Sequence, residues 1–229
     1  MMCLVLSVMA FAQTGVDFQH LTFDEALAKA KAEKKLVFVD CYTTWCGPCK
    51  MMTTKIFPMK EAGEFFNPRF VCVKFDMEQG EGKELKNKLG VRAYPSFFII
   101  RPDGTVQHAV VGGGELEPFI ERVKKGLNEK TSLLYLNQQY EKGKMNKKQL
   151  LAYKVALDDA YDQKKAEQVK KETKKLEDVV TQITDYIKNN KSDMDKIKPI
   201  IAKTKELGYE NPTTISKVED AEIVLELIS

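Results

Sequence analysis

Two cysteines with two residues between them, Cys46 and Cys49, constrain this chain more than any other feature. Thiols at this spacing either close a reversible disulfide or supply half of a tetrahedral zinc site. A zinc site would need a second pair of Cys or His ligands. The remaining thiols and imidazoles all stand singly, at Cys3, Cys41, Cys72, His20 and His108. The pattern therefore favours redox chemistry and no metal.

The residues on either side of the pair predict a strand before it and a helix after it. Leu36–Tyr42 is a short apolar run rich in β-branched residues, which is typical of a buried parallel strand. Cys46 would then lie near a helix N-terminus, where free backbone N–H groups and the helix dipole favour a thiolate. Cys49 would lie about one turn further in, more buried and less ionised. We therefore expect Cys46 to attack a disulfide and Cys49 to resolve the product.

The sequence resembles the thioredoxin family in features that lie well outside the Cys-Gly-Pro-Cys motif. Asp40 stands six residues before Cys46, where that family carries a buried acid. Lys74 corresponds to the lysine beside this acid, and Tyr94-Pro95-Ser96 to the loop that holds a cis-proline. These features follow the family's order over roughly residues 16–128.

The resemblance implies an α/β thioredoxin fold, with a central mixed sheet flanked by helices. It also implies a redox-active Cys46–Cys49 disulfide with no other cofactor, which exchanges with the thiols and disulfides of proteins. Burial would raise the pKa of Asp40, with Lys74 as a countercharge, so that Asp40 can pass a proton to or from Cys49. The alternative is an aspartate exposed to solvent at the end of the strand.

The residues next to the cysteines are expected to support the site and to dock substrates. Trp45 either shields the disulfide or is an ordinary exposed aromatic residue. Gly47 and Pro48 resemble the residues of reducing thioredoxins, and Pro48 falls in the first helical turn, where its missing N–H costs nothing. The resemblance implies a cis Pro95 whose loop binds an incoming peptide. Tyr94 replaces a smaller residue of the family, which leaves the potential and the partner choice open.

Cys41 falls inside the predicted strand Leu36–Tyr42, and Cys72 falls inside a second predicted strand, Phe70–Asp76. A buried free cysteine behaves mostly as a small apolar side chain, and we favour this interpretation over a redox role for both. A second disulfide between them stays open at the level of sequence.

The N-terminal residues predict export from the cytosol. Met2–Ala12 is an uncharged apolar run that ends in the small-x-small pattern Ala10-Phe11-Ala12. The run is shorter than the roughly 20 apolar residues that span a bilayer. We expect residues 1–12 to be a signal peptide and the mature protein to be periplasmic or secreted and not membrane-spanning. The alternative is an apolar tail, since no Lys or Arg precedes the run.

The composition changes near Glu129 and divides the chain into two predicted domains. Residues 13–129 carry the thioredoxin-like features. In residues 130–229 strand-like runs vanish and Lys, Glu, Gln and Leu recur at helical spacing, which predicts an all-α domain loosely like a helical repeat array. Its expected helices are Leu133–Lys142, Lys147–Asp162, Lys164–Ile187 with a possible break, Met194–Leu207 and Val218–Ile228.

Two functions are consistent with these features. The first is a thiol:disulfide oxidoreductase that reduces disulfides of extracytoplasmic proteins and receives electrons from a membrane carrier. The second is a client- or partner-binding module in which the helical domain has the main role and the redox site is secondary. Nucleic-acid binding is excluded, because the net charge is only +3 and no basic patch is interleaved with aromatic residues.

Overall fold

The computed structural model describes residues 15–143 and 145–228, so the predicted signal peptide lies outside the described residues. The chain divides into two compact units, one ending at Lys124 and the other beginning at Lys125. We call them the sheet unit and the helical unit. The division falls inside helix α5 (Leu116–Leu127), five residues before the predicted domain boundary, because the composition changes only after this helix has ended.

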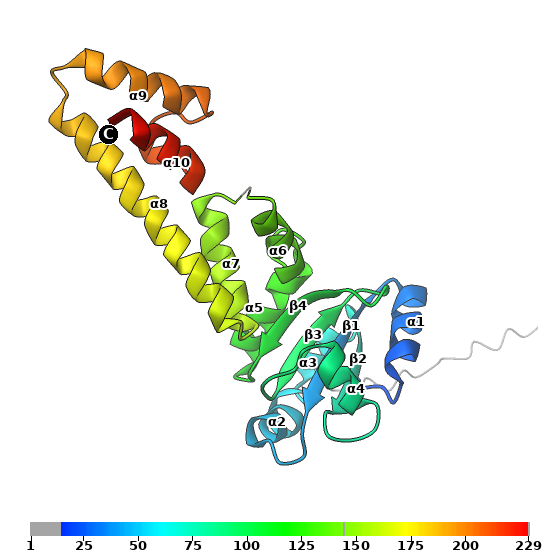
Figure 1. Cartoon of the computed structure of the whole chain (residues 1–229). Coiled ribbons are helices and arrows are strands. Elements are labelled where there is room, and N and C mark those ends of the chain that lie inside the picture. The colour runs from blue at the N-terminus through cyan, green and yellow to red at the C-terminus, as the bar shows by residue number, and fades with distance from the viewer. Residues whose placement is uncertain (1–14, 144, 229) are drawn as a thin grey trace, which may run out of the picture. The chain divides into compact units, whose positions relative to one another are not determined.

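The sheet unit is built on four strands in the order β2-β1-β3-β4 (Figure 1). Strand β1 (Leu36–Tyr42) pairs in parallel with β2 (Phe70–Asp76) and antiparallel with β3 (Ser96–Ile100). Strand β4 (Val106–Val111) pairs antiparallel with β3. This mixed sheet confirms the predicted thioredoxin fold.

Helices join and flank these strands. They are α1 (Phe23–Glu33), α2 (Gly47–Met51), a π-helical turn η1 (Met52–Ile56), α3 (Lys60–Phe66), α4 (Gly82–Lys88) and α5. Helix α1 begins at a capping box, in which the Thr22 side chain accepts from the Glu25 backbone N–H while the Glu25 carboxylate accepts from the Thr22 backbone N–H.

An aromatic cluster fills one face of the sheet. Phe38 of β1 stacks on Phe97 of β3, with ring centroids 5.6 Å apart. Phe66 of α3 lies 4.7 Å from Phe38, and Phe119 of α5 lies 4.8 Å from Phe97. Helices α3 and α5 therefore cover this face. Because side chains alternate along a strand, Asp40 points to the same face as Phe38.

The helical unit consists of five main helices among the described residues. They are α6 (Leu133–Glu141), α7 (Lys147–Asp159), α8 (Gln163–Asn189), α9 (Met194–Glu206) and α10 (Val218–Leu225). Helix α8 runs unbroken for 27 residues, although the sequence left a break open. Asn146 and Asp162 cap the starts of α7 and α8 with their side chains. Nowhere in the described ranges is a helix long and apolar enough to cross a bilayer.

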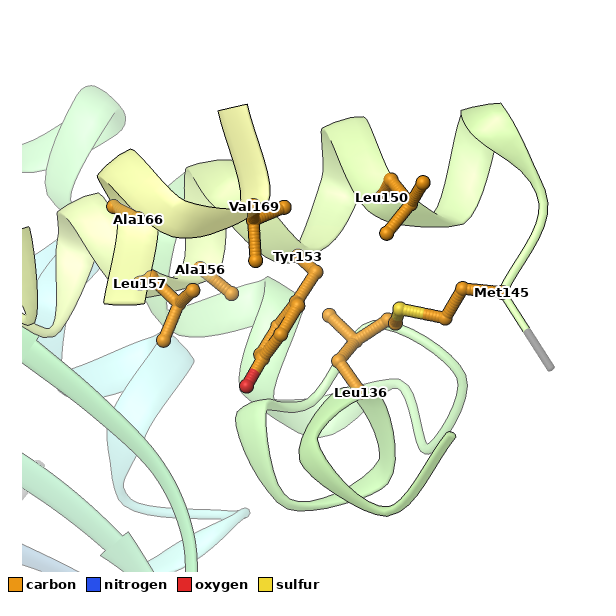
Figure 2. Packing of buried hydrophobic residues seen from close by; sticks show 8 residues of the cluster. All are labelled: Leu136, Met145, Leu150, Tyr153, Ala156, Leu157, Ala166 and Val169. Carbon is orange, nitrogen blue, oxygen red and sulfur yellow. The ribbon is translucent and has the colours of Figure 1, made fainter. Parts of the chain in front are cut away.

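Two buried clusters hold these helices together, and α8 contributes to both. The first cluster lies between α6, α7 and the start of α8 (Figure 2); it comprises Leu136, Met145, Leu150, Tyr153, Ala156, Leu157, Ala166 and Val169. The second lies between the end of α8 and the segments that follow; it comprises Leu176, Val179, Ile183, Ile200, Ile215, Ala221 and Val224. Each short helix is thus stabilised by packing one apolar side against α8 or its neighbours.

Candidate active site

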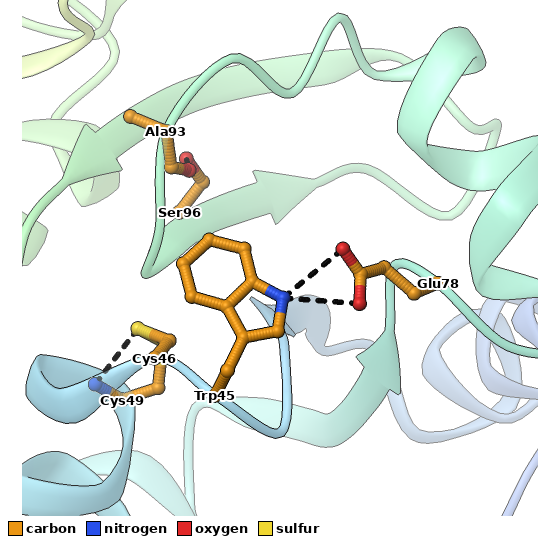
Figure 3. The surroundings of a disulfide bond; sticks show 6 residues. All are labelled: Trp45, Cys46, Cys49, Glu78, Ala93 and Ser96. Atoms are coloured by element: carbon orange, nitrogen blue, oxygen red, sulfur yellow. Dashed lines mark hydrogen bonds between the residues drawn. A yellow bond between two sulfur atoms is a disulfide. The ribbon is translucent and has the colours of Figure 1, made fainter.

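Cys46 and Cys49 form a disulfide at the start of α2, with their Cα atoms 5.3 Å apart (Figure 3). Cys46 is the N-cap residue of this helix, in an extended conformation. Its Sγ accepts a hydrogen bond of 3.1 Å from the backbone N–H of Cys49. Pro48 lies in the first turn, as predicted. The first turn of the helix therefore directs a backbone donor at the sulfur of Cys46.

The expectation that Cys49 is more buried than Cys46 is wrong for this disulfide form. Both residues are 3% exposed. The disulfide holds the two side chains together, so the surrounding residues cover both. What distinguishes the two sulfurs is the N-cap position of Cys46 and the N–H that it accepts, because a donated N–H and the helix dipole both favour a thiolate.

Asp40 is buried in the middle of the sheet, only 2% exposed. It pairs in register with Lys74 of β2 and with Phe97 of β3. Among the described residues, its Oδ1 has no hydrogen-bond partner. Burial raises the pKa of Asp40 to about 7, while the positive charge of Lys74 acts in the opposite direction. The alternative of a solvent-exposed aspartate is therefore wrong.

Lys74 itself is exposed on the neighbouring strand. Its ammonium lies 5.7 Å from the centre of the Phe18 ring. The positive charge of Lys74 is therefore attracted both by the face of this ring and by the carboxylate of Asp40. The structure thus brings the acid and its predicted countercharge to adjacent positions.

The loop before β3 contains a cis peptide bond between Tyr94 and Pro95. The Pro95 carbonyl accepts from the Gly112 backbone N–H at 2.8 Å, which ties this loop to the bend after β4. The Ser96 hydroxyl donates to the Ala93 carbonyl at 2.7 Å, and both residues lie in the surroundings of the disulfide (Figure 3).

Trp45 is 64% exposed beside the disulfide, and two neighbours hold it in place. Its indole N–H donates to both carboxylate oxygens of Glu78, at 3.0 and 3.1 Å (Figure 3). The Tyr94 ring meets the indole edge-on at 5.8 Å, and the Lys86 ammonium lies 5.8 Å from the centre of the Tyr94 ring. The aromatic surface next to the cysteines is therefore fixed in orientation.

Glu78 is a site residue that the sequence reasoning missed. It lies in the charged loop just after β2, whereas Trp45 lies just after β1. The carboxyl ends of neighbouring parallel strands meet at one edge of a sheet, so the two loops come together there. This rule, applied to the acidic residues after β2, would have predicted that Glu78 lies near Trp45.

Cys41 and Cys72 are buried free thiols. Cys72 pairs in register with Phe38, whereas Cys41 is an odd number of residues away from Phe38 on β1. Because side chains alternate along a strand, the two cysteines point to opposite faces of the sheet and cannot form a disulfide. Burial raises the pKa of both thiols, which keeps them protonated and unreactive.

The comparisons with known proteins match the sheet unit. The family model described as Thioredoxin covers residues 15–125. Thioredoxin Asp f 28 of Aspergillus fumigatus is 31% identical over 97 residues, which cover 42% of this chain and 84% of that protein. The chain belongs to the thioredoxin family. Thioredoxin F of rice chloroplasts is 40% identical over 95 residues, which cover 41% of this chain and 48% of the relative.

A similar solved structure comes from Bacteroides thetaiotaomicron. This candidate disulphide-isomerase, solved in solution, is 44% identical, with 50% of this chain and 95% of that chain covered and a TM-score of 0.47. This chain spans about half the length of the rice protein and 64% of thioredoxin Asp f 29. What those whole proteins do therefore comes to this chain only as a proposal.

Thioredoxin-family proteins use a redox-active disulfide in place of an external cofactor, and the Cys46–Cys49 pair occupies the active-site position. In the described part of the chain, no group of three or more His, Cys, Asp or Glu side chains is arranged to hold a metal ion.

Proposed function

We propose that this protein is a thiol:disulfide oxidoreductase that reduces disulfides in extracytoplasmic proteins. The observation that carries this proposal is the Cys46–Cys49 disulfide at a helix N-terminus, with a backbone N–H donated to Cys46 Sγ. A sulfur in this position is stabilised as a thiolate, the form that attacks disulfides.

In the reducing direction, the thiolate of reduced Cys46 attacks one sulfur of a substrate disulfide. A mixed disulfide forms and the first substrate thiolate leaves. Cys49 then loses its proton and attacks Cys46 Sγ, which breaks the mixed disulfide and releases the second substrate thiolate. Two electrons pass to the substrate, and the protein is left with the Cys46–Cys49 disulfide seen here.

Asp40 would accept the proton that Cys49 gives up in the second step. A carboxyl group with a pKa of about 7 can take and return a proton near neutral pH. Its Oδ1 is buried and unpartnered among the described residues, so it is free to accept this proton directly or through a water molecule.

The substrate would dock on the surface next to the disulfide. Trp45 offers an exposed apolar face there, held by Glu78 and Tyr94. The loop at Pro95 would offer backbone groups to an extended peptide. In this arrangement Tyr94 acts mainly by fixing Trp45.

The direction and the location rest on the sequence. Gly47 and Pro48 between the cysteines support a reductant over a strong oxidant. The apolar run of residues 2–12 supports export, and an exported reductase would need a membrane electron carrier to return it to the reduced state. A periplasmic or secreted location is thus part of the proposal.

The alternative of a client-binding helical domain gains little from this structure. The helical unit has a cleft of about 290 Å³ lined by Tyr140 and Glu172 among others. However, the Tyr140 hydroxyl donates to Glu172 at 2.6 Å, so these two polar groups satisfy each other.

The equilibrium reduction potential of Cys46–Cys49 against a glutathione series tests the proposal. A value of about −270 mV is expected for a reductase, whereas one of about −120 mV would identify an oxidant that makes disulfides. The variant Cys41→Ala is the control and should leave the potential unchanged. A protein with no measurable redox transition would contradict the oxidoreductase function altogether.

A further inference from the structure

A groove of about 750 Å³ runs between α3 and the first half of α5 in the sheet unit. Its apolar lining comprises Met59, Phe65, Leu116, Pro118 and Ile120. Met59 is among the exposed large apolar residues, and Phe65 and Ile120 are half-buried. The groove therefore offers apolar surface that a partner could bury.

Carboxylates surround this apolar surface. Glu61, Glu115, Glu117 and Glu121 line the groove, against the single ammonium of Lys124. Lys124 already pairs with Glu121 at 2.6 Å. Within the described ranges, Glu61, Glu115 and Glu117 have no ion-pair partner. One further cation is close by, since the Arg69 guanidinium lies 4.8 Å from the centre of the Phe65 ring. Three exposed carboxylates without an ion-pair partner still line one apolar groove, so negative charge exceeds positive charge there and favours a positively charged occupant.

The groove begins close to the loops that surround the disulfide. The Gly112 backbone N–H bonds to the Pro95 carbonyl at 2.8 Å. A Cβ atom at Gly113 would lie only 2.7 Å from Met52 side-chain atoms, so this bend is packed tightly on the helix that follows the cysteines. Glu115 follows Gly112 by three residues, at most about 11 Å of extended chain. A polypeptide bound at the disulfide can therefore continue into the groove.

Building on the proposed reductase function, we propose that the α3–α5 groove docks a segment of the substrate protein in which basic residues alternate with apolar ones. The apolar side chains of this segment would cover Phe65 and Ile120. Its Lys or Arg side chains would face Glu61, Glu115 and Glu117. The negative field would also speed the encounter with such a substrate, an effect that salt weakens.

Two disulfide peptides test this inference. Both carry the same intramolecular disulfide, followed by a segment of alternating Lys and Leu in one and alternating Glu and Leu in the other. The full chain is kept reduced with dithiothreitol, and kcat/KM is measured for each peptide. At low ionic strength the basic peptide is expected to react about tenfold faster, and this preference should fade as salt is added.

Two matched triple variants locate the effect. E61Q/E115Q/E117Q should abolish the preference for the basic peptide. D24N/E33Q/E84Q removes the same number of exposed charges from α1 and α4 of the sheet unit and should preserve it. Glutamine and asparagine keep the sizes of glutamate and aspartate at these exposed positions, so both variants are expected to fold, which circular dichroism checks. Equal rates for both peptides, or a preference that survives E61Q/E115Q/E117Q, would overturn the groove while leaving the reductase function intact.

Two further measurements separate the remaining outcomes. If neither peptide is reduced, the proposed reductase function fails. In that case fluorescence anisotropy with a cysteine-free basic peptide tests the groove alone: binding that is lost in E61Q/E115Q/E117Q supports the groove, and no binding overturns it. The alternative occupant is a second copy of this chain, which sedimentation tests by measuring the oligomeric state. A wild-type dimer that E61Q/E115Q/E117Q converts to monomer would place a second copy in the groove and overturn the proposal.

Discussion

The two units of this chain treat their buried polar side chains differently. In the helical unit the hydroxyls of Thr173, Thr204 and Ser132 are buried, and each donates to a backbone carbonyl of its own segment, at 2.8, 2.8 and 3.0 Å respectively. In the described part of the sheet unit, Asp40 Oδ1, Thr43 Oγ1 and the Tyr94 hydroxyl oxygen are buried without a hydrogen-bond partner.

The unsatisfied atoms lie around the cysteine pair. Thr43 is three residues before Cys46, and its carbonyl accepts from the Cys46 backbone N–H. An unpaired buried polar atom costs about 1–3 kcal/mol, so a fold keeps few of them without a use. In the sheet unit we propose that this use is proton transfer at Asp40. In the helical unit the three buried hydroxyls are satisfied by backbone carbonyls.

The substitution with the largest expected effect removes the attacking thiol of the sheet unit. Cys46→Ser should lower the rate of disulfide reduction by at least about 10³-fold, because a hydroxyl is not ionised at neutral pH. Cys72→Ala, which also removes a buried thiol of the sheet unit, should retain the rate. Comparable losses in both variants, measured with an insulin-type protein disulfide, would contradict the assignment of Cys46.

A substitution that creates a cavity in the helical unit tests whether the packing of this unit affects disulfide reduction in the sheet unit. Ile183 is fully buried in the second cluster. Ile183→Ala should destabilise the helical unit by about 2–5 kcal/mol, without changing kcat for disulfide reduction. Ile223→Ala on α10, where the side chain is 39% exposed, is the matched control and should have a much smaller effect. Hydrogen exchange resolves the two units, and a parallel fall in kcat would show that they are coupled.

The pH dependence of stability tests the unsatisfied acid. The pKa of Asp40 is raised to about 7 in the folded protein, above its ordinary value of about 4. Between these values the folded state holds a proton that the unfolded chain has released, so stability falls as pH rises, by about 4 kcal/mol in all.

Asp40→Asn removes this loss. The variant should be more stable than wild type by about 3 kcal/mol at pH 8.5, allowing about 1 kcal/mol for a buried amide, and no more stable near pH 3.5. Denaturant titrations at the two pH values measure this, and the rate of disulfide exchange should lose its inflection near pH 7. Parallel stability curves for the two proteins would show that Asp40 titrates normally.

The smallest expected effect concerns Glu78. Glu78→Gln weakens the hydrogen bond to the Trp45 indole, which should raise KM about threefold with little change in kcat. Trp45 is the only tryptophan of the chain, so its fluorescence anisotropy reports the loosened ring directly. Glu84→Gln, at an exposed position of α4, is the control. A change in kcat alone would mean that Glu78 acts on the chemistry and not on the docking surface.

Local patterns in the sequence predicted much of the fold. Leu36–Tyr42 and Phe70–Asp76 are strands with the predicted bounds, and the capping box at Thr22 begins α1. These features depend on neighbours along the chain, through alternation and capping. Asp40 was placed by resemblance, and the structure supplied its burial.

Other features depend on residues that meet only after folding. Cys46 and Cys49 are equally buried because the closed disulfide holds their side chains together. The opposite directions of Cys41 and Cys72 follow from the register between β1 and β2, which no single segment encodes. The α3–α5 groove needs the two helices to lie side by side on one face of the sheet.

The length of α8 separates the two buried clusters of the helical unit, which bears on how many helices the unit can carry. At about 1.5 Å per residue, Val169 in the first cluster and Ile183 in the second lie about 21 Å apart along one helix. Both clusters therefore include residues of α8, but no side chain belongs to both. A packed group of helices can therefore be lost from or added to the C-terminal end of α8, while α6, α7 and the start of α8 keep their own core.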